Sequence, residues 1–426
     1  MTKYVLMFLM LFYTYLCFGK DSARRVLIQK ILSMSIFSIC FGVIIYNRFS
    51  PAAVVVFAIE FIYLIVFDVL FGKIYRNSSK ELTSNMTMLL AIGFVILWRL
   101  SPDSAIKQLI FAIAGSVGMF FVPMLAKQIK IIVKARWLLA VIGIVLLSVT
   151  LVLGQTSFGA NLSFTIAGFT FQPSEFVKIS FVLFIAGMLS KTADRKSVII
   201  TGIIAVIHVL ILVTSTDLGA ALIYFVVYIF AVYIATGKLR YFITGLVCTS
   251  GASVLAYKVF SHVRTRIDTW INPWPYIDGK GYQITQSLFA IGTGGLFGLG
   301  LCKGSPGSIP VVKKDFIFAA ISEELGLIFA IAMVLVCVSI FIRIMRLASV
   351  CKDDFYKITA SAFAVMYIFQ CFLTIGGVTK FIPLTGVTLP LVSYGGSSLI
   401  STFFMLGIIQ TIFMVEGVTE SEKIES

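Results

Sequence analysis

The sequence is poor in charge and almost without histidine. Only 12% of its 426 residues are charged, about half the share found in an average soluble domain. The two histidines, His208 and His262, argue against a histidine-based metal site. The seven cysteines are scattered, without the spacing of a disulfide framework or a metal motif. This composition argues against a soluble globular protein, and we expect no metal site built from these residues.

Acidic residues are outnumbered, because 34 lysines and arginines stand against 19 aspartates and glutamates and leave a net charge of +15. Such an excess could indicate nucleic-acid binding, but the basic residues gather in alternate short loops between apolar runs. Cationic short loops stay on the cytoplasmic side of a membrane. The charge therefore predicts topology, with a cytoplasmic C-terminus, an extracellular N-terminus and no nucleic-acid partner.

What the sequence has in excess is apolar residues, which make up 59% of the chain. A helix needs about 20 mostly apolar residues to span a bilayer. The apolar runs predict an all-α polytopic membrane protein with thirteen segments, of which the first two are short. The segments cover residues 4–18, 31–46, 52–72, 84–98, 105–126, 137–153, 174–190, 198–213, 218–236, 241–259, 316–342, 358–375 and 397–415.

Three long loops are expected on the outer side, near residues 154–173, 260–315 and 376–396, and they hold seven of the ten prolines. Loops of this length in a compact protein are usually functional. Non-helical backbone at membrane depth is tolerated where protein buries it or where it lines a cavity. The outer face is therefore where we expect the chemistry.

The stretch "IPVVKKDFIFAAISEELG" places Asp315 at the outer mouth of an apolar segment. Its carboxylate could cap the helix start. It could also act as a general base, since partial desolvation raises a carboxyl pKa toward the working range. The local sequence leaves both interpretations open. At about 100° per residue, Ala319, Ser322 and Gly326 share the helix face of Asp315, so a groove or a closely packed helix is expected beneath it.

Glu323 and Glu324 belong to the same stretch but not to the same face. Helix geometry places them about 12 Å deeper than Asp315 and pointing elsewhere. Ionisable groups inside a membrane need partners or a water-filled cavity. We therefore interpret both glutamates as structural or cavity-lining residues rather than as catalytic ones.

Two more helix starts carry carboxylates. In "FQPSEFVK", Ser174 is a plausible cap, and Glu175 and Lys178 are three residues apart and can meet on one helix face. They form either a self-neutralising pair or a buried cation available to a phosphate, and the pattern does not decide. In "TDLGAALIY", Asp217 stands at a helix start, and we interpret it as a cap.

The large loop is basic and rich in glycine. Arg264, Arg266 and several lysines suit an anionic ligand such as a pyrophosphate, although a solvated basic loop is the alternative. The glycines between Gly292 and Gly300 miss the spacing of nucleotide-binding motifs. They are expected to allow a re-entrant or closely packed backbone.

The last loop, "TGVTLPLVSYGGSSLIS", ends in a Gly-Gly pair at the start of an apolar helix. Exposed N–H groups at a helix N-terminus form a ready anion site, and an ordinary capped helix start is the alternative. We assign its polar and glycine residues to substrate binding, together with two residues of the large loop: Ser393, Gly395, Gly396, Ser397, Gln283 and Lys314.

Five segments, taken in order, resemble the SEDS family of bacterial cell-wall polymerases (FtsW, RodA and SpoVE). They are "FQPSEFVKI", "TDLGAALI", "RTRIDTWINPWPYIDGKGYQITQSLFAIGTGGLFGLGL", "IPVVKKDFIFAAISEELG" and "LPLVSYGGSSLI". The resemblance implies a ten-helix membrane enzyme of the bacterial cytoplasmic membrane. Such an enzyme polymerises lipid II into undecaprenyl-pyrophosphate-linked glycan on the outer face, with a class B penicillin-binding protein as partner.

The resemblance also implies site roles. The family's proposed catalytic aspartate matches Asp315, and its loop arginine matches Arg266. Glu323 and Glu324 match its paired glutamates, and Glu175 and Lys178 match its "QPSE…K" residues. Asp315 would then take a proton from the acceptor hydroxyl, while Arg264, Arg266 and the lysines neutralise the pyrophosphate. No cofactor is certain, although a divalent cation, Mg²⁺ or Mn²⁺, could assist there.

The chain departs from the family at Ser215-Thr216 and Leu162-Ser163, where the family usually has Gln-Pro and Arg-Trp. Residues 1–80 are expected to add about three helices before the ten-helix core of residues 81–416, with a cytoplasmic tail at 417–426. Glu60 and Asp68 in the added helices have no family role; they are expected to pair with basic residues of the core or to contact a partner helix. A lipid flippase or transporter, or a non-catalytic scaffold of the cell-wall machinery, remains the alternative function.

Overall fold

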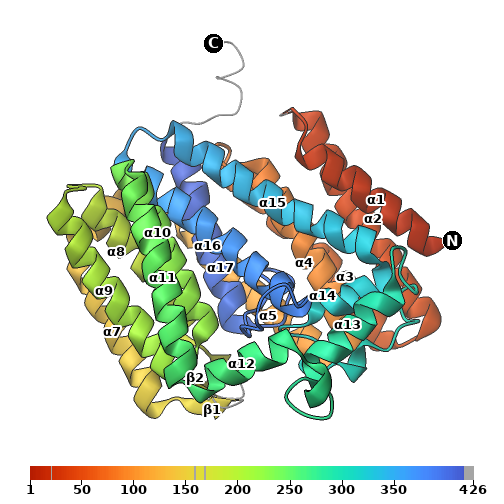
Figure 1. Ribbon diagram of the computed structural model, residues 1–426. Coiled ribbons are helices and arrows are strands. Elements are labelled where there is room, and N and C mark those ends of the chain that lie inside the picture. Colours follow the sequence, from red (N-terminus) through yellow and green to blue (C-terminus); the bar gives the residue numbers. More distant parts are fainter. Residues whose placement is uncertain (21, 158–159, 167–168, 417–426) are drawn as a thin grey trace.

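The computed structural model describes residues 1–20, 22–157, 160–166 and 169–416. The expected cytoplasmic tail, 417–426, lies outside the described residues, as does Gly159 in the first long loop. Most of the described chain is helical, and the helices run roughly parallel to one another as a bundle (Figure 1).

The α-helices are α1 (Thr2–Cys17), α2 (Ala23–Asn47), α3 (Pro51–Ile74), α4 (Lys80–Leu100), α5 (Pro102–Phe121), α6 (Ile129–Lys134), α7 (Arg136–Leu153), α8 (Pro173–Leu189), α9 (Arg195–Thr214), α10 (Leu218–Thr236), α11 (Leu239–Val259), α12 (Ser261–Ile271), α13 (Tyr282–Gly294), α14 (Ile317–Leu325), α15 (Leu327–Val350), α16 (Asp354–Val378) and α17 (Gly396–Val415). Short 3-10 turns lie at η1 (Pro123–Gln128), η2 (Trp274–Tyr276) and η3 (Pro306–Ser308).

Within the described residues, 11 helices are long and apolar enough to cross a membrane, and α1 is a shorter apolar helix. The predicted class, an all-α polytopic membrane protein, is confirmed. Large apolar side chains such as Phe8, Ile62 and Leu255 remain exposed on the outer helices. In water such a surface would favour aggregation, whereas in a bilayer it faces lipid.

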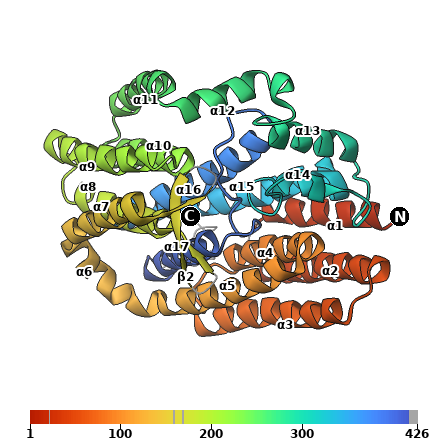
Figure 2. The same cartoon turned by 90° about the horizontal axis from the view of Figure 1, so that it is seen from below.

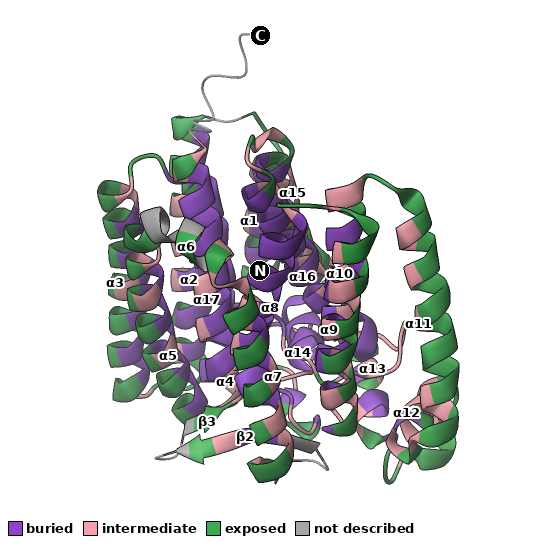
Figure 3. Ribbon diagram, turned by 90° about the vertical axis from the view of Figure 1, so that its left-hand side faces the viewer, coloured by how far each residue is buried: buried purple, intermediate pink, exposed green. Residues whose placement is uncertain are grey.

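The core of the bundle is formed by α4, α8, α16 and α17. Most of their residues are buried, as the purple colour in Figure 3 shows. All residues of α4 from Glu81 to Trp98 are buried. Gly93 makes this possible at one point, because a Cβ there would lie 2.8 Å from the carbonyl oxygen of Val392. By contrast, α11 buries none of its residues and stands at the edge of the bundle.

The first helices are attached to the rest by buried polar contacts. The Tyr13 hydroxyl of α1 donates to Asn85 Oδ1 of α4 at 2.9 Å, and Asn85 donates in turn to Ser339 Oγ of α15 at 2.9 Å. Glu81 of α4 forms ion pairs with Arg25 of α2 and with Arg343 of α15. Helices α1 and α2 are thus part of the bundle rather than loose additions.

The two acids of α3 differ in their surroundings. Asp68 pairs with Lys30 of α2 at 2.6 Å. Its partner therefore belongs to the added helices, whereas a basic residue of the core was expected. Glu60 is fully buried, and no described group hydrogen-bonds to either of its carboxyl oxygens.

Two local features differ from the predicted pattern. The first long loop forms a small antiparallel sheet, in the order β1 (Gln155–Ser157), β2 (Ala160–Ile166) and β3 (Phe169–Phe171), with Phe164 opposite Phe171. The expected single segment 316–342 is also divided in two, because the chain breaks between α14 and α15 at Gly326.

The break has a backbone cause. Gly326 has φ +92, and a Cβ there would lie 2.5 Å from the backbone nitrogen of Gly298, which itself has φ +71. Only glycine adopts such a conformation at such a distance without strain. The expectation that the glycine-rich run allows close backbone packing is therefore confirmed.

Candidate active site

A cavity of about 540 Å³ opens at the end of the bundle where the long loops gather. Figure 2 views this end and shows α12, α13 and α14 arranged around the central helix α16. The walls come from Gln172 before α8, from the start of α10, from α12, from the loop before α13 and the start of α13, from the turn before α14 and from the segment between α16 and α17. Segments from six regions of the sequence therefore meet here.

Asp315 faces this cavity from the turn that precedes α14. It does not cap the helix, because the N-cap residue of α14 is Phe316 and the cap has no side-chain hydrogen bond. The capping interpretation is therefore wrong, and so is the expected shared face with Ser322, since Asp315 precedes the helix. Burial raises the pKa of Asp315 to about 6, while the charges of Lys314 and Arg266 act in the opposite direction.

Arg266 of α12 lines the same cavity. Its Nη1 atom donates to the backbone oxygens of Leu384 and Thr385 at 3.4 and 3.3 Å, which fixes the guanidinium to the segment after α16. Burial lowers the pKa of Arg266, and the carboxylates of Asp217 and Asp315 raise it. The guanidinium therefore lies within electrostatic range of both acids.

Two lysines and a glutamine also line the cavity. Lys314 precedes Asp315 in the same turn, and Gln283 begins α13 with Lys280 just before it. Lys314, Gln283 and Arg266 were predicted as substrate-binding residues, and the structure places all three in one cavity with Asp315. A cationic cavity of this kind suits a phosphate-bearing ligand.

Asp217 caps α10, as expected, and it also lines the cavity. Its Oδ1 atom accepts a hydrogen bond from the backbone N–H of Ala220 at 3.0 Å. Its Oδ2 atom accepts bonds from Ser174 Oγ and Gln172 Nε2, both at 3.3 Å. Because both carboxyl oxygens of Asp217 accept hydrogen bonds from the protein, we interpret it as a structural residue of the cavity wall. Ser174 does not cap α8, whose N-cap is Gln172.

The structure does not bring Arg264 to the cavity. Its side chain is exposed, donates to the backbone oxygen of Lys258 at 3.2 Å and lies over the ring of Tyr257 at 5.7 Å. Arg264 and Arg266 are two residues apart on one helix and hence about 200° apart around its axis. The prediction that Arg264 contacts the same ligand as Arg266 is contradicted by this geometry.

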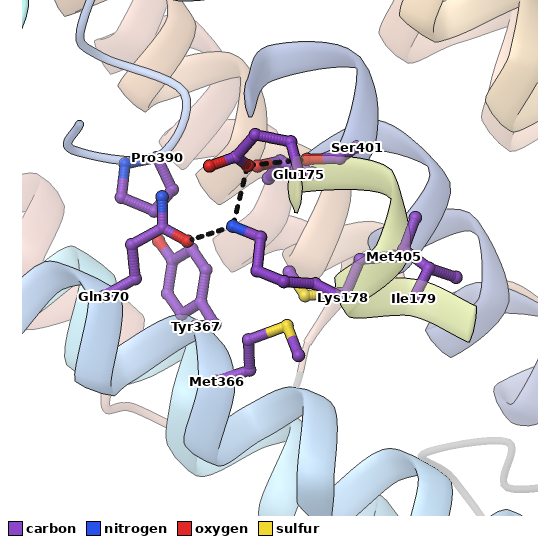
Figure 4. Close-up of a pocket in the computed structure, with 10 residues that line it drawn as sticks. Glu175, Lys178, Ile179, Met366, Tyr367, Gln370, Pro390, Ser401 and Met405 are labelled. Atoms are coloured by element: carbon purple, nitrogen blue, oxygen red, sulfur yellow. Dashed lines mark hydrogen bonds and ion pairs between the residues drawn. The ribbon is translucent and has the colours of Figure 1, made fainter. Parts of the chain in front are cut away.

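Glu175 and Lys178 form a separate buried cluster (Figure 4). Lys178 Nζ lies 2.7 Å from Glu175 Oε2 and 3.0 Å from Gln370 Oε1, and Ser401 Oγ donates to Glu175 at 3.2 Å. The void beside them is only about 10 Å³, room for no more than one water molecule. The pair is thus self-neutralising, and Lys178 is not available to a phosphate.

The start of α17 is closed rather than open to an anion. A Cβ at Gly396 would lie 2.4 Å from the ring of Phe111, which covers this helix end. The N–H of Gly395 donates to Gln108 Oε1 at 3.3 Å, and Ser397 Oγ accepts from the backbone N–H of Gln172 at 2.9 Å. These three predicted substrate-binding residues hold the loops together instead.

Ser393 does not line the cavity, but it holds the turn that carries Lys314 and Asp315. Its hydroxyl accepts from the N–H of Leu389 at 3.0 Å and donates to the backbone oxygen of Lys314 at 2.6 Å. The N–H of Tyr394 donates to the oxygen of Lys313 at 2.8 Å. This loop therefore positions the Lys313–Asp315 turn without lining the cavity itself.

Glu323 and Glu324 lie at the far end of α14, away from the cavity. Glu323 accepts from the N–H of Ser305 at 2.8 Å, and Glu324 pairs with Arg99 of α4 at 2.9 Å and accepts from the N–H of Gly304 at 3.2 Å. Their carboxylates tie the end of α14 to the loop before it and to α4.

Sequence reasoning missed some of the residues lining the cavity. Thr216, in the Ser215-Thr216 departure, lines it with φ +62, and the segment from Leu384 to Thr388 forms one wall. Residues 385–388 belong to the quoted stretch of the last loop, but the substrate-binding assignment there fell on later residues, from Ser393 to Ser397, because this part has neither charge nor helix signal. For the other departure, Ser163 is buried, and the side chain of Leu162 lies outside the described residues.

The chain is similar in sequence to several known proteins. A family described as "Cell cycle protein", with members FtsW, RodA and SpoVE, matches residues 80–416. The chain is 33% identical over 356 residues to the peptidoglycan glycosyltransferase RodA of Mycobacterium tuberculosis, which covers 77% of this chain and 76% of the relative. It is 32% identical over 348 residues to the stage V sporulation protein E of Bacillus subtilis, covering 76% and 94%.

The fold matches a solved structure as well. A chain of a peptidoglycan synthase complex, described as coordinating polymerization and crosslinking, superposes with a TM-score of 0.69 at 25% identity. The match covers 80% of this chain and 98% of that one. Since the family pattern matches residues 80–416 and about a third of the aligned residues are identical in these relatives, this protein belongs to the FtsW, RodA and SpoVE (SEDS) family.

Proposed function

We propose that this protein is a peptidoglycan glycosyltransferase that polymerises lipid II, with Asp315 as its general base. The observation that carries the proposal is the position of Asp315, which faces a cationic cavity, does not cap a helix and has a pKa raised to about 6. A base is most effective when its pKa lies near the working pH. The names of the relatives support the reaction class.

The chemistry assigns a part to each cavity residue. The acceptor sugar hydroxyl attacks the anomeric carbon of the donor, so a new C–O bond forms while the bond to the lipid pyrophosphate breaks. The bonding electrons leave with the pyrophosphate, and the hydroxyl proton passes to Asp315. Arg266, Lys314 and Lys280 line the same cavity and neutralise the charge that develops on the leaving group.

A divalent cation would come with the substrate. The described residues hold no group of three or more His, Cys, Asp or Glu side chains suited to a metal ion. Mg²⁺ is often held by one or two carboxylates together with substrate phosphates. The Gln283 amide oxygen lines the cavity and would contact such an ion, which would supply further charge neutralisation at the pyrophosphate and leave Asp315 free to act as the base.

The proposal includes the setting of the enzyme. The basic loops favour a cytoplasmic C-terminus, so the cavity would open on the outer face of the bacterial cytoplasmic membrane and the N-terminus would lie outside. A class B penicillin-binding protein is the partner that would cross-link the glycan, which fits a structural neighbour within a peptidoglycan synthase complex.

The test uses the full chain in proteoliposomes supplied with labelled lipid II, with and without the transpeptidase. We expect polymer from the wild type and at least about 10²-fold less from Asp315→Asn, with lipid II binding retained. Movement of lipid II across the bilayer without polymer would instead support a flippase. Binding without polymer or movement, by a wild-type protein with its partner present, would support a scaffold.

A further inference from the structure

A second cavity lies at the same end of the bundle as the candidate active site but between different elements. It measures about 630 Å³, and its walls are the first turn of α1, the last turns of α2 and residues 299–303 of the loop after α13. Figure 2 shows α1 and α2 at one edge of the bundle, and α12 lies apart from them. Two of its three walls belong to helices that precede the family match at residues 80–416.

The cavity has an apolar side and a cationic side. Leu6, Ile39 and Val43 supply an apolar side, whereas Lys3 and Lys303 supply cationic groups. None of the described residues that line it is acidic. Lys3 Nζ donates to the backbone oxygen of Gly298 at 2.7 Å, which holds the ammonium in place and leaves two of its three donors free.

The wall formed by residues 299–303 is held rigidly. The N–H groups of Leu299 and Gly300 donate to the backbone oxygens of Glu323 and Glu324 at 2.9 and 2.8 Å. The Glu324 side chain is itself fixed by Arg99. The backbone that carries Lys303 is therefore fixed before a ligand binds, which lowers the conformational entropy lost on binding, whereas the Lys303 side chain itself is exposed.

The apolar wall has room for a hydrocarbon chain. A Cβ added at Gly42, on the face of α2 that lines the cavity, would meet no atom within 4 Å. Tyr46 and Asn47 follow at the end of α2, at the level where polar and aromatic residues meet lipid headgroups. The cavity volume is also typical of small-ligand sites, about 300–1,000 Å³.

We propose that this cavity binds an anionic phospholipid of the surrounding bilayer. The phosphodiester lies between Lys3 and Lys303, and an acyl chain runs along Ile39, Gly42 and Val43. A free phosphate would leave the apolar wall uncovered, and a neutral lipid would leave both ammonium groups unmatched. Anionic phospholipid is the occupant that satisfies both sides of the cavity.

The test measures binding directly. The full-length protein is placed in phosphatidylcholine nanodiscs with increasing fractions of phosphatidylglycerol, and retained phosphatidylglycerol is counted by native mass spectrometry. Lys3→Gln and Lys303→Gln should each raise the fraction needed for half-occupancy about fivefold. Gly42→Leu should abolish retention at this site, because its side chain fills the open groove and a helix tolerates leucine well.

Matched controls separate this site from general effects. Lys107→Gln removes an exposed lysine of α5 outside the cavity, and Gly72→Leu adds the same side chain to α3, where a Cβ also meets no atom within 4 Å. Both should retain the lipid as the wild type does. Equal retention by all variants would overturn the proposal, as would inorganic phosphate displacing the lipid.

A parallel series replaces phosphatidylglycerol with a polyprenyl phosphate. If the polyprenyl lipid binds more tightly and shows the same dependence on Lys3, Lys303 and Gly42, the occupant is a carrier lipid and the phospholipid assignment is wrong. Because no step of the test measures glycan synthesis, its outcome is independent of the function proposed above.

Discussion

Asp315 and Arg266 face one cavity from two separate elements, and each stabilises the charged form of the other. The arginine is held in place by two backbone oxygens of the segment after α16, while the aspartate sits in a turn fixed from behind by Ser393. A base and a cation for the leaving group are thereby placed together before substrate arrives. Such preorganisation is a main source of enzymatic rate enhancement.

Removing the base should abolish most of the reaction. Asp315→Asn keeps the shape of the side chain but cannot accept the proton, so we expect polymer formation from lipid II to fall about 10²–10⁴-fold. Polymer length and yield on gels measure the loss, and binding of labelled lipid II should change little. The control is Asp103→Asn, an exposed residue in the first turn of α5. Full activity in the Asp315 variant would rule out the assignment.

The reaction should have an acid limb near pH 6. Asp315 acts as a base only when it is ionised, and its pKa is raised to about 6. Activity is therefore present above this pH and should fall up to about tenfold per unit below it. Lys314 lowers the pKa of Asp315, so Lys314→Gln should move the limb to higher pH. Lys107→Gln should leave the limb in place, and an unmoved limb in the Lys314 variant would contradict the coupling.

The two arginines of α12 should differ sharply. Arg266→Gln removes the buried guanidinium from the cavity, where a charge-assisted contact to phosphate is worth about 1.5–3 kcal/mol, so kcat/KM should fall about 10–100-fold. Arg264→Gln changes an exposed side chain that contacts Lys258 and Tyr257, and its effect should stay within about twofold. Equal losses in both variants would mean that the loop acts through its overall charge.

The buried ion pair of Glu175 and Lys178 should contribute to the stability of the fold. Removing one partner of a buried ion pair typically costs about 3–5 kcal/mol, so Glu175→Gln and Lys178→Met should each lower the thermal unfolding temperature markedly. The double variant leaves no uncompensated charge and should lose less than the sum of the two. Lys191→Met, at an exposed site after α8, is the control. Additive losses would mean that the two side chains act independently.

The break between α14 and α15 should tolerate only glycine. Gly326→Ala places a Cβ 2.5 Å from the Gly298 nitrogen at φ +92, and the backbone conformation alone costs about 1–3 kcal/mol. Gly292→Ala lies within α13, where a Cβ meets no atom within 4 Å, and should be neutral or stabilising by about 0.5–1 kcal/mol. Thermal unfolding of both variants in detergent measures the difference.

Much of the fold could be predicted because membrane helices depend on local composition. The segment expected at 218–236 coincides with α10 (Leu218–Thr236), since an apolar run of that length can satisfy its backbone in lipid only as a helix. The division at Gly326 could not be predicted, because a lone glycine within an apolar run is common. Its cause is the opposing Gly298, which lies 28 residues earlier in the sequence.

The candidate site was only partly predictable, because contacts between residues far apart in the sequence also decide which side chains reach the cavity. The sequence indicated Asp315, Arg266, Lys314 and Gln283, but it grouped them with Lys178 and Gly396, which the structure places in packed interiors. Charge and spacing report what a residue can do, and they do not report whether space is left beside it. The phenyl ring of Phe111 over Gly396 decides that question, and it comes from another helix.

The sequence by itself determined that this protein spans a membrane many times, and it predicted that the short basic loops share one side, because hydropathy and charge act locally along the chain. It also determined that Glu175 and Lys178 could pair, since three residues bring them to one helix face. Only the tertiary structure decided which charged residues share a cavity. For Asp315, a candidate base already in the sequence, the structure removed the helix-cap alternative and showed loops distant in sequence that surround it, desolvate its carboxyl and place Arg266 beside it.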